Sequence, residues 1–114
     1  MAIKPEEKRQ FPRIGLRIPI RFQIRGLPQF DNAISDNISV GGLGFTGERF
    51  IAPSTPVMLE IDVLSRILHS AGKIAWSHAL PHSNRNRLGV EFVELSCSEK
   101  AYLSDYIDMQ MEKF

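Results

Sequence analysis

The 114-residue sequence contains a single cysteine, Cys97, so the chain cannot form an internal disulfide. A lone cysteine fits a reducing compartment, and we expect a cytoplasmic protein. No apolar run approaches the roughly 20 residues of a membrane-spanning helix. The first eight residues also lack the apolar core of a signal peptide. The sequence therefore predicts no membrane insertion.

The sequence also lacks the common signatures of enzymes and metal sites. It contains no Walker loop, no Gly-x-Gly-x-x-Gly motif and no pairing of a nucleophile with a base. The three histidines, His69, His78 and His82, do not form a metal-ligand spacing with Cys97 or with carboxylates. We therefore expect neither catalysis nor a bound metal.

The sequence also has no large excess of positive or negative charge, because its net charge is only +1. The basic residues are nevertheless unevenly placed. Residues 1–25 hold seven Lys or Arg against two Glu, whereas the rest of the chain holds seven basic and 11 acidic residues. A basic leading segment on a near-neutral domain indicates a local anionic ligand. Nucleic acid usually needs a broadly basic face, so we predict no nucleic-acid partner.

The hydrophobic pattern predicts one domain, mostly β, built as a six-stranded antiparallel barrel. Apolar and polar residues alternate with the period of two that half-buried strands show. In the first strand this alternation leaves Arg21 and Arg25 on a solvated face. In the second strand it places Phe30, Ile34 and Ile38 together on one face. The expected strands cover residues 18–25, 30–38, 43–46, 57–63, 69–78 and 88–92.

The two ends of the chain differ from the strand region. Pro5, Pro12 and a run of charges disfavour regular structure, so residues 1–12 are expected to form a flexible basic arm. At the other end, Ser96 and Glu99 have capping-box spacing, in which each side chain would bond the other's backbone N–H. We predict a barrel domain over residues 13–114, closed by a helix over residues 97–113. The apolar stripe of this helix consists of Leu103, Tyr106, Ile107, Met111 and Phe114.

Arg9 and Arg13 are the strongest candidates for an anion site. Pro12 restricts Phe11 to extended backbone, so an irregular segment carries the two guanidinium groups. Arginine forks fit phosphate oxygens and the O6 and N7 edge of guanine, and their planes stack on purines. A ligand that offers phosphates and guanines would use all three capacities. Solvated charges on a loose arm are the alternative.

A second candidate segment follows the second expected strand. Asn37 and Ser39 are two residues apart and share a strand face, whereas Asp36 does not fit this register. Asn37 can accept from a guanine N–H, and Ser39 can hold a phosphate or a ribose hydroxyl. Gly42, after Gly41, removes a side chain where a ligand passes or the strand bulges. A polar strand end with a glycine turn is the alternative.

Together the two segments resemble the motifs of the PilZ family. Arg9 and Arg13 resemble the RxxxR arginines, and Asn37, Ser39 and Gly42 resemble the fixed positions of (D/N)xSxxG. The strand order and the closing helix are also similar to a stand-alone PilZ domain, so the resemblance covers nearly the whole chain. It implies a receptor for the bacterial second messenger cyclic di-GMP. Asn37 stands where many members carry Asp, which removes a charge that could pair with guanine N1–H and N2–H and lowers the expected affinity.

The resemblance also singles out Lys8 and Trp76. A basic residue before the first motif arginine tends, in this family, to accompany an intercalated dimer of cyclic di-GMP. An ordinary surface lysine is the alternative. Trp76 resembles an aromatic residue that lies beside the ligand in some PilZ domains, with barrel packing as the alternative. The predicted cyclic di-GMP residues are Lys8, Arg9, Arg13, Asn37, Ser39, Gly41, Gly42 and Trp76.

The leading hypothesis is a receptor whose arm folds over cyclic di-GMP and presents a changed surface to an unidentified effector protein. With one domain in the sequence, the output would pass through another protein. Two alternatives remain at this stage. One is a PilZ-like protein interaction module that does not bind nucleotide, and the other is a small barrel that binds single-stranded nucleic acid.

Overall fold

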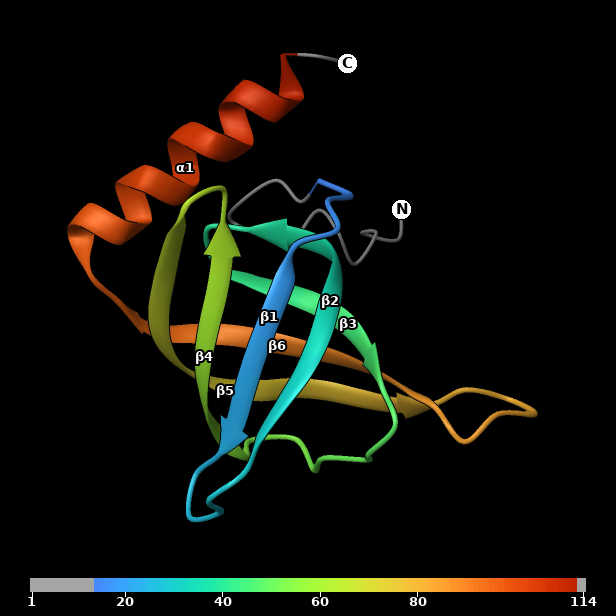
Figure 1. Cartoon of the computed structure of the whole chain (residues 1–114). Coiled ribbons are helices and arrows are strands. Elements are labelled where there is room, and N and C mark those ends of the chain that lie inside the picture. Colours follow the sequence, from blue (N-terminus) through green and yellow to red (C-terminus); the bar gives the residue numbers. More distant parts are fainter. Residues whose placement is uncertain (1–13, 113–114) are drawn as a thin grey trace, which may run out of the picture.

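The computed structural model describes residues 14–112 and shows a closed antiparallel barrel with one C-terminal helix (Figure 1). Neighbouring strands follow the order β1-β2-β3-β6-β5-β4, and β4 closes the ring by pairing with β1. The predicted fold class is therefore confirmed. The elements are β1 (Pro19–Ile24), β2 (Phe30–Ser39), β3 (Gly42–Gly47), β4 (Pro56–Val63), β5 (Arg66–Ala79), β6 (Asn86–Leu95) and α1 (Cys97–Met111).

The core fills the inside of the barrel with the apolar members of each alternation. Phe22 and Phe45 meet there, with ring centroids 5.1 Å apart, and Phe45 is fully buried. Because every second residue of a strand points inward, the intervening residues form the outer face. Arg21 is one of them; it is exposed, as predicted, and lies 3.2 Å from Glu60 on β4.

The prediction that Phe30, Ile34 and Ile38 share one face of the second strand is wrong. Phe30 and Ile34 are 37% and 48% exposed, whereas Ile38 is fully buried. The register between β2 and β3 shifts between Ser35 and Asn37, so that Asp36 is an extra residue. Such a bulge reverses the parity of the strand that follows it. Asn37 therefore points outward and Ile38 inward.

Helix α1 crosses one end of the barrel beside the β4–β5 turn (Figure 1). Ser96 caps the helix, since its hydroxyl accepts from the backbone N–H of Glu99 at 3.2 Å. The second half of the predicted capping box differs, because Glu99 accepts instead from the backbone N–H of His69 at 2.8 Å. This bond ties the helix to β5. The Glu99 carboxylate thus serves the contact between helix and barrel.

The apolar stripe of α1 is shorter than predicted. Leu103 and Ile107 are buried and join the barrel core, and Tyr106 is partly buried against it. Met111 is 44% exposed, so its assignment to the packed stripe is wrong. Phe114 lies outside the described residues. The helix axis carries the last turn beyond the rim of the barrel, where no core remains to cover it (Figure 1).

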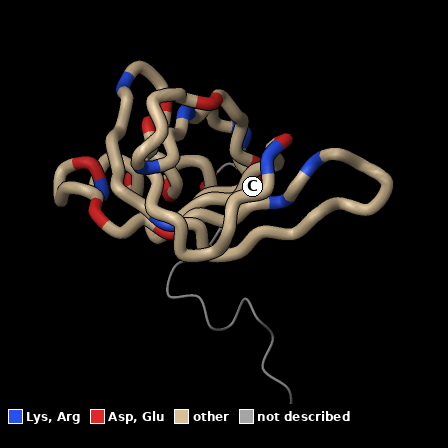
Figure 2. The backbone as a smooth tube through the Cα atoms, turned by 90° about the horizontal axis from the view of Figure 1, so that it is seen from below, with Lys and Arg blue, Asp and Glu red and all other residues tan. Residues whose placement is uncertain are grey.

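The length of helix α1 and the distribution of charged residues both bear on function. Over the described range, α1 is neither long nor apolar enough to cross a membrane. Basic and acidic positions are interspersed along the chain in residues 14–112 (Figure 2). A mixed surface of this kind gives no broad field of one sign.

Candidate functional site

One row of residues crosses four neighbouring strands on the outer face of the barrel. The register pairs Asn37 of β2 with Gly44 of β3, Gly44 with Gly89 of β6, and Gly89 with Trp76 of β5. The adjacent residues on β3 and β6, such as Leu43 and Leu88, are fully buried inside the barrel. The row therefore faces outward. We call Asn37, Gly44, Gly89 and Trp76 the platform.

The two glycines of the platform make room for the two side chains. A Cβ atom on Gly89 would lie 2.3–2.7 Å from three atoms of the Trp76 indole. A Cβ atom on Gly44 would lie 3.1 Å from both Nδ2 and Oδ1 of Asn37. The indole and the carboxamide thus lie directly over bare backbone. Trp76 is half-buried and packs over Gly89 on the outer face, which agrees with the alternative of barrel packing and leaves its part in ligand binding a prediction.

The rings of Trp76 and His78 lie side by side on β5. Their centroids are 5.4 Å apart and their planes differ by 33°. A second register shift, between Ile74 and Trp76, makes Ala75 an extra residue and turns the indole outward. Without that shift Trp76 would share the inward face with fully buried Ile74. The bulge therefore sets the orientation of this aromatic side chain.

Charged side chains border the platform at Asn37. The Nδ2 atom of Asn37 donates to Oδ1 of Asp36 at 3.1 Å. The other carboxylate oxygen of Asp36 forms an ion pair with Arg87 of β6. Arg87 stands on the outer face between Thr46 and His78 in the register. These contacts join the bulge residue of β2 to a strand two positions away in the barrel.

The predicted site residues of the β2–β3 turn have clear structural roles. Ser39 is 3% exposed, and its hydroxyl accepts from Gly41 N–H at 3.1 Å and donates to the Gly42 carbonyl at 3.4 Å. The Gly41 carbonyl accepts from the backbone N–H of Phe92 at 2.9 Å. A Cβ atom on Gly42 would lie 2.2 Å from the Val90 carbonyl oxygen. This crowding explains the glycine through barrel packing.

The segment that leads into the barrel enters beside the platform. Ile14 and Ile38 exchange two backbone hydrogen bonds of 3.0 Å each. Ser35 fixes the next residues, since its buried hydroxyl accepts from Ile18 N–H and donates to the Leu16 carbonyl. Ile14 is thus paired with the residue between Asn37 and Ser39. The predicted residues Lys8, Arg9 and Arg13 lie outside the described residues.

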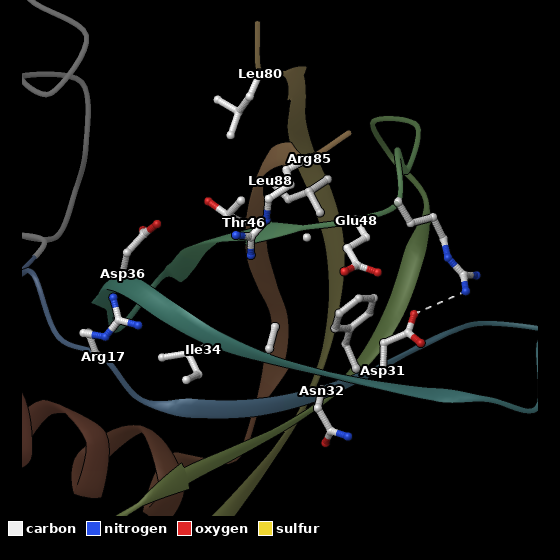
Figure 3. A pocket seen from close by; sticks show the side chains of 14 residues that line it. Arg17, Asp31, Asn32, Ile34, Asp36, Thr46, Glu48, Leu80, Arg85 and Leu88 are labelled. Carbon is white, nitrogen blue, oxygen red and sulfur yellow. Dashed lines mark ion pairs between the residues drawn. The ribbon is translucent and has the colours of Figure 1, made fainter. Parts of the chain in front are cut away.

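A separate groove of about 1000 Å³ opens where β2 and β3 diverge (Figure 3). The β2–β3 ladder ends at the pair of Ser35 and Phe45, so the first half of β2 no longer contacts β3. Figure 3 shows Arg17 and Asp36 on one side of the groove and Asp31 on the other, where Asp31 lies 3.6 Å from Arg49. Three arginines and three carboxylates line this groove. Because these charges balance, the groove is a poorer match for an anion than a cluster of arginines.

Metal binding has no support in the part of the chain that the structure describes. Within residues 14–112, no three His, Cys, Asp or Glu side chains come together as a metal site would require. Cys97 is a free, exposed thiol in this range. The platform itself offers an aromatic ring that can stack and a carboxamide that can form hydrogen bonds.

Sequence reasoning missed four residues around the platform: Asp36, Gly44, Arg87 and Gly89. Isolated glycines inside Leu43–Phe45 and Leu88–Val90 were a usable signal, because a glycine within a strand often marks a close approach. The ion pair between Asp36 and Arg87 gave no such signal. It depends on a bulge in β2 and on a residue of β6, two strands away in the barrel and 51 positions later in the chain.

Comparisons with known proteins identify the family and the fold. The family model described as PilZ domain matches residues 7–108, which is most of the chain. No curated protein matches the chain at a significant level. The match therefore covers both the described barrel and the segment with the two predicted arginines.

Several solved structures share the fold. The Bacillus subtilis inhibitor of motility MotI/DgrA superposes with a TM-score of 0.80 at 19% identity, over 93% of this chain and 53% of that one. The PilZ domain of Escherichia coli YcgR with c-di-GMP gives 0.72 at 15% identity, covering 93% and 92%. The Borreliella burgdorferi PlzA protein in complex with c-di-GMP gives 0.53 at 16% identity, covering 87% and 47%. The present chain thus spans about half the length of MotI/DgrA and PlzA.

Proposed function

The chain belongs to the PilZ domain family, and from this membership and the platform we propose that it is a bacterial receptor for cyclic di-GMP. Two of the similar structures, from YcgR and PlzA, contain that ligand. The receptor would bind and signal without catalysing a reaction. Its single cysteine is compatible with the cytoplasm as the place of action.

The observation that carries the proposal is the pairing of Ile14 with Ile38. In the sequence, Arg13 directly precedes Ile14 and Arg9 stands five residues before it. Five residues of extended chain span at most about 17 Å. We propose that both motif arginines come within reach of Asn37 when the ligand is bound. Guanidinium groups at this place can meet the phosphates and the guanine edge of a cyclic dinucleotide.

The two platform side chains and the β2–β3 turn each have a part in the proposal. The Trp76 indole supplies an aromatic face on which a flat purine can stack, because every base has a π-face. The Asn37 carboxamide supplies hydrogen bonds to a guanine edge. Ser39, Gly41 and Gly42 hold the β2–β3 turn in shape through the contacts described above. Their contribution to binding would then be the shape of the backbone as well as direct contact.

Signalling would follow from ordering of the basic arm, residues 1–12. Like charges repel one another in a segment without a ligand, and an ordered arm loses conformational entropy. Ligand phosphates neutralise these charges, and the ordered arm then forms part of a new surface for an effector protein. Lys8 would add a further cation for the four phosphates of an intercalated dimer. The expected stoichiometry is therefore two ligands per chain.

Isothermal titration with cyclic di-GMP tests the proposal. The parent protein is expected to bind, and Arg9→Ala combined with Arg13→Ala is expected to abolish measurable binding, because both phosphate-directed cations are lost. Arg25→Ala is the matched control, since it removes one exposed arginine just beyond β1. Its affinity is expected to equal that of the parent.

The possible outcomes separate the hypotheses. No heat with the parent protein would refute the receptor hypothesis and favour the alternative of a PilZ-like interaction module that does not bind nucleotide. Binding that survives the double substitution would refute the role of the two arginines. A stoichiometry of one ligand per chain would refute the intercalated dimer and the proposed function of Lys8.

A further inference from the structure

Asp36 and Arg87 lie next to the platform but match none of the motif positions. Asp36 is the extra residue of the β2 bulge, and both of its carboxylate oxygens have partners. Oδ1 accepts from Asn37 Nδ2 at 3.1 Å, and Oδ2 pairs with the Arg87 guanidinium. Hydrogen bonds to charged groups are about twice as strong as neutral ones. A continuous chain of contacts therefore runs from Arg87 through Asp36 to Asn37.

This chain of contacts selects one orientation of the Asn37 carboxamide. An ionised carboxylate only accepts hydrogen bonds, so the NH₂ end of Asn37 must face Asp36. The contact with Gly44 does not distinguish the two ends, because Nδ2 and Oδ1 are both 3.1 Å from its Cβ position. With Nδ2 turned toward Asp36, the carbonyl Oδ1 is directed away from it.

We infer that Asp36 and Arg87 are positioning residues that hold Asn37 as a hydrogen-bond acceptor for guanine, an inference that rests on the proposed cyclic di-GMP site. On its Watson–Crick edge guanine presents two adjacent donors, N1–H and N2–H, whereas adenine presents one donor, N6–H, beside an acceptor at N1. An acceptor in a fixed orientation thus favours guanine. Asn37 has no negative charge, unlike the Asp that many members of the family carry at this position. In this chain a carboxylate lies one residue earlier, at Asp36, and Arg87 balances its charge.

The inference reverses the expectation for the substitution Asn37→Asp. A second carboxylate at position 37 would face Asp36 at hydrogen-bond distance, and like charges there repel. We expect Asn37→Asp to weaken cyclic di-GMP binding on the order of tenfold. The exchanged pair, Asp36→Asn with Asn37→Asp, restores one donor and one carboxylate. We expect its affinity to return to within about threefold of the parent.

Titrations with cyclic di-GMP and cyclic di-AMP test both the affinity and the selectivity. The predicted pattern is weak binding for Asn37→Asp, recovery for the exchanged pair, and a preference for the guanine ligand that falls on the order of tenfold in Asp36→Ala. A general loss of structure would lower both affinities together and leave their ratio unchanged. The inference is overturned if Asn37→Asp alone binds at least as tightly as the parent, or if Asp36→Ala keeps the parent's ratio.

A measurement without ligand keeps this inference separate from the proposed function. In ¹H–¹⁵N spectra, the side-chain NH₂ signals of Asn37 are expected to move in Asp36→Ala and in Arg87→Gln. The matched control is Glu91→Gln, which breaks the 3.4 Å ion pair with Lys73 on the same outer face and should leave these signals in place. Unchanged signals in Asp36→Ala would overturn the inference even if the parent binds cyclic di-GMP. Failure of the parent to bind would refute the receptor but not the orientation of Asn37.

Discussion

At the scale of single residues, glycine determines what the site can offer. Gly89 and Gly44 carry no side chain, so an indole and a carboxamide lie flat against the barrel. Gly42 serves a different purpose, because a Cβ atom there would strike the backbone of β6. The motif glycine is thus explained by packing, whereas two glycines outside the motif shape the platform.

Gly89→Ala is expected to displace Trp76. The new methyl group would come 2.3 Å from the indole, so the ring must move. Trp76 is the only tryptophan, and its fluorescence emission should therefore shift. Loss of a stacking face is expected to weaken cyclic di-GMP binding on the order of tenfold. Gly15→Ala is the control, since its nearest neighbour is the Asp36 carbonyl oxygen at 3.7 Å. Equal emission spectra for Gly89→Ala and the parent would contradict this geometry.

At the scale of elements, alternation located all six strands and the inward face of β1 and β4, but not every strand end and not the reversal of faces within β2. β5 and β6 extend beyond the expected 69–78 and 88–92, because residues 66–68 pair with β4 and Glu94 and Leu95 pair with β5. Asp36 in β2 and Ala75 in β5 are each an extra residue, so the residues after them point to the opposite face from the one that simple alternation predicts. A bulge depends on the partner strand, so one strand's sequence does not reveal it. The same limit hid the contact between Asp36 and Arg87.

Helix α1 shows how one side chain can link two elements. The pKa of Glu99 is lowered, chiefly by the hydrogen bond from the His69 backbone N–H; Ser96 and the nearby charges of His69 and Arg66 add to this, while burial opposes it. A lowered pKa in the folded state means that the unfolded chain binds the proton more readily. The resulting stability is present above the ordinary glutamate pKa of about 4.3 and is lost as the pH falls through the lower folded value.

Glu99→Gln is expected to remove this pH-dependent contribution. Near pH 7 the variant should be less stable than the parent by about 0.5 kcal/mol, the usual worth of a carboxylate in the first turn of a helix. The difference should shrink at a second, acidic pH below the folded pKa of Glu99, which is lower than the ordinary value of about 4.3, because the carboxylate of the parent becomes protonated there. Urea denaturation at both pH values measures it. A difference of the same size at both would show that the Glu99 charge does not act through the folded state.

At the scale of the whole molecule, closure of the barrel joins the site and the helix to one core. Each strand has two neighbours, so β2, β3, β6 and β5 hold the platform without a free edge among them. Leu103 and Ile107 of α1 belong to the same buried cluster as Phe22 and Phe45. Tyr102 adds a hydrogen bond of 3.2 Å from its hydroxyl to the Val63 carbonyl. The helix is therefore a part of the barrel's core.

Leu103→Ala tests whether barrel and helix unfold as one unit. Leu103 is fully buried, so its truncation should lower the free energy of unfolding by about 2–5 kcal/mol. Because the core is shared, the loss should shift a single transition, seen alike by far-UV circular dichroism and by Trp76 fluorescence. Met109→Ala is the matched control on the same helix: Met109 is 44% exposed, and we expect a change within about 0.5 kcal/mol. Two separate transitions in Leu103→Ala, with the fluorescence midpoint unmoved, would show instead that the helix is an independent appendage and that the platform does not depend on it.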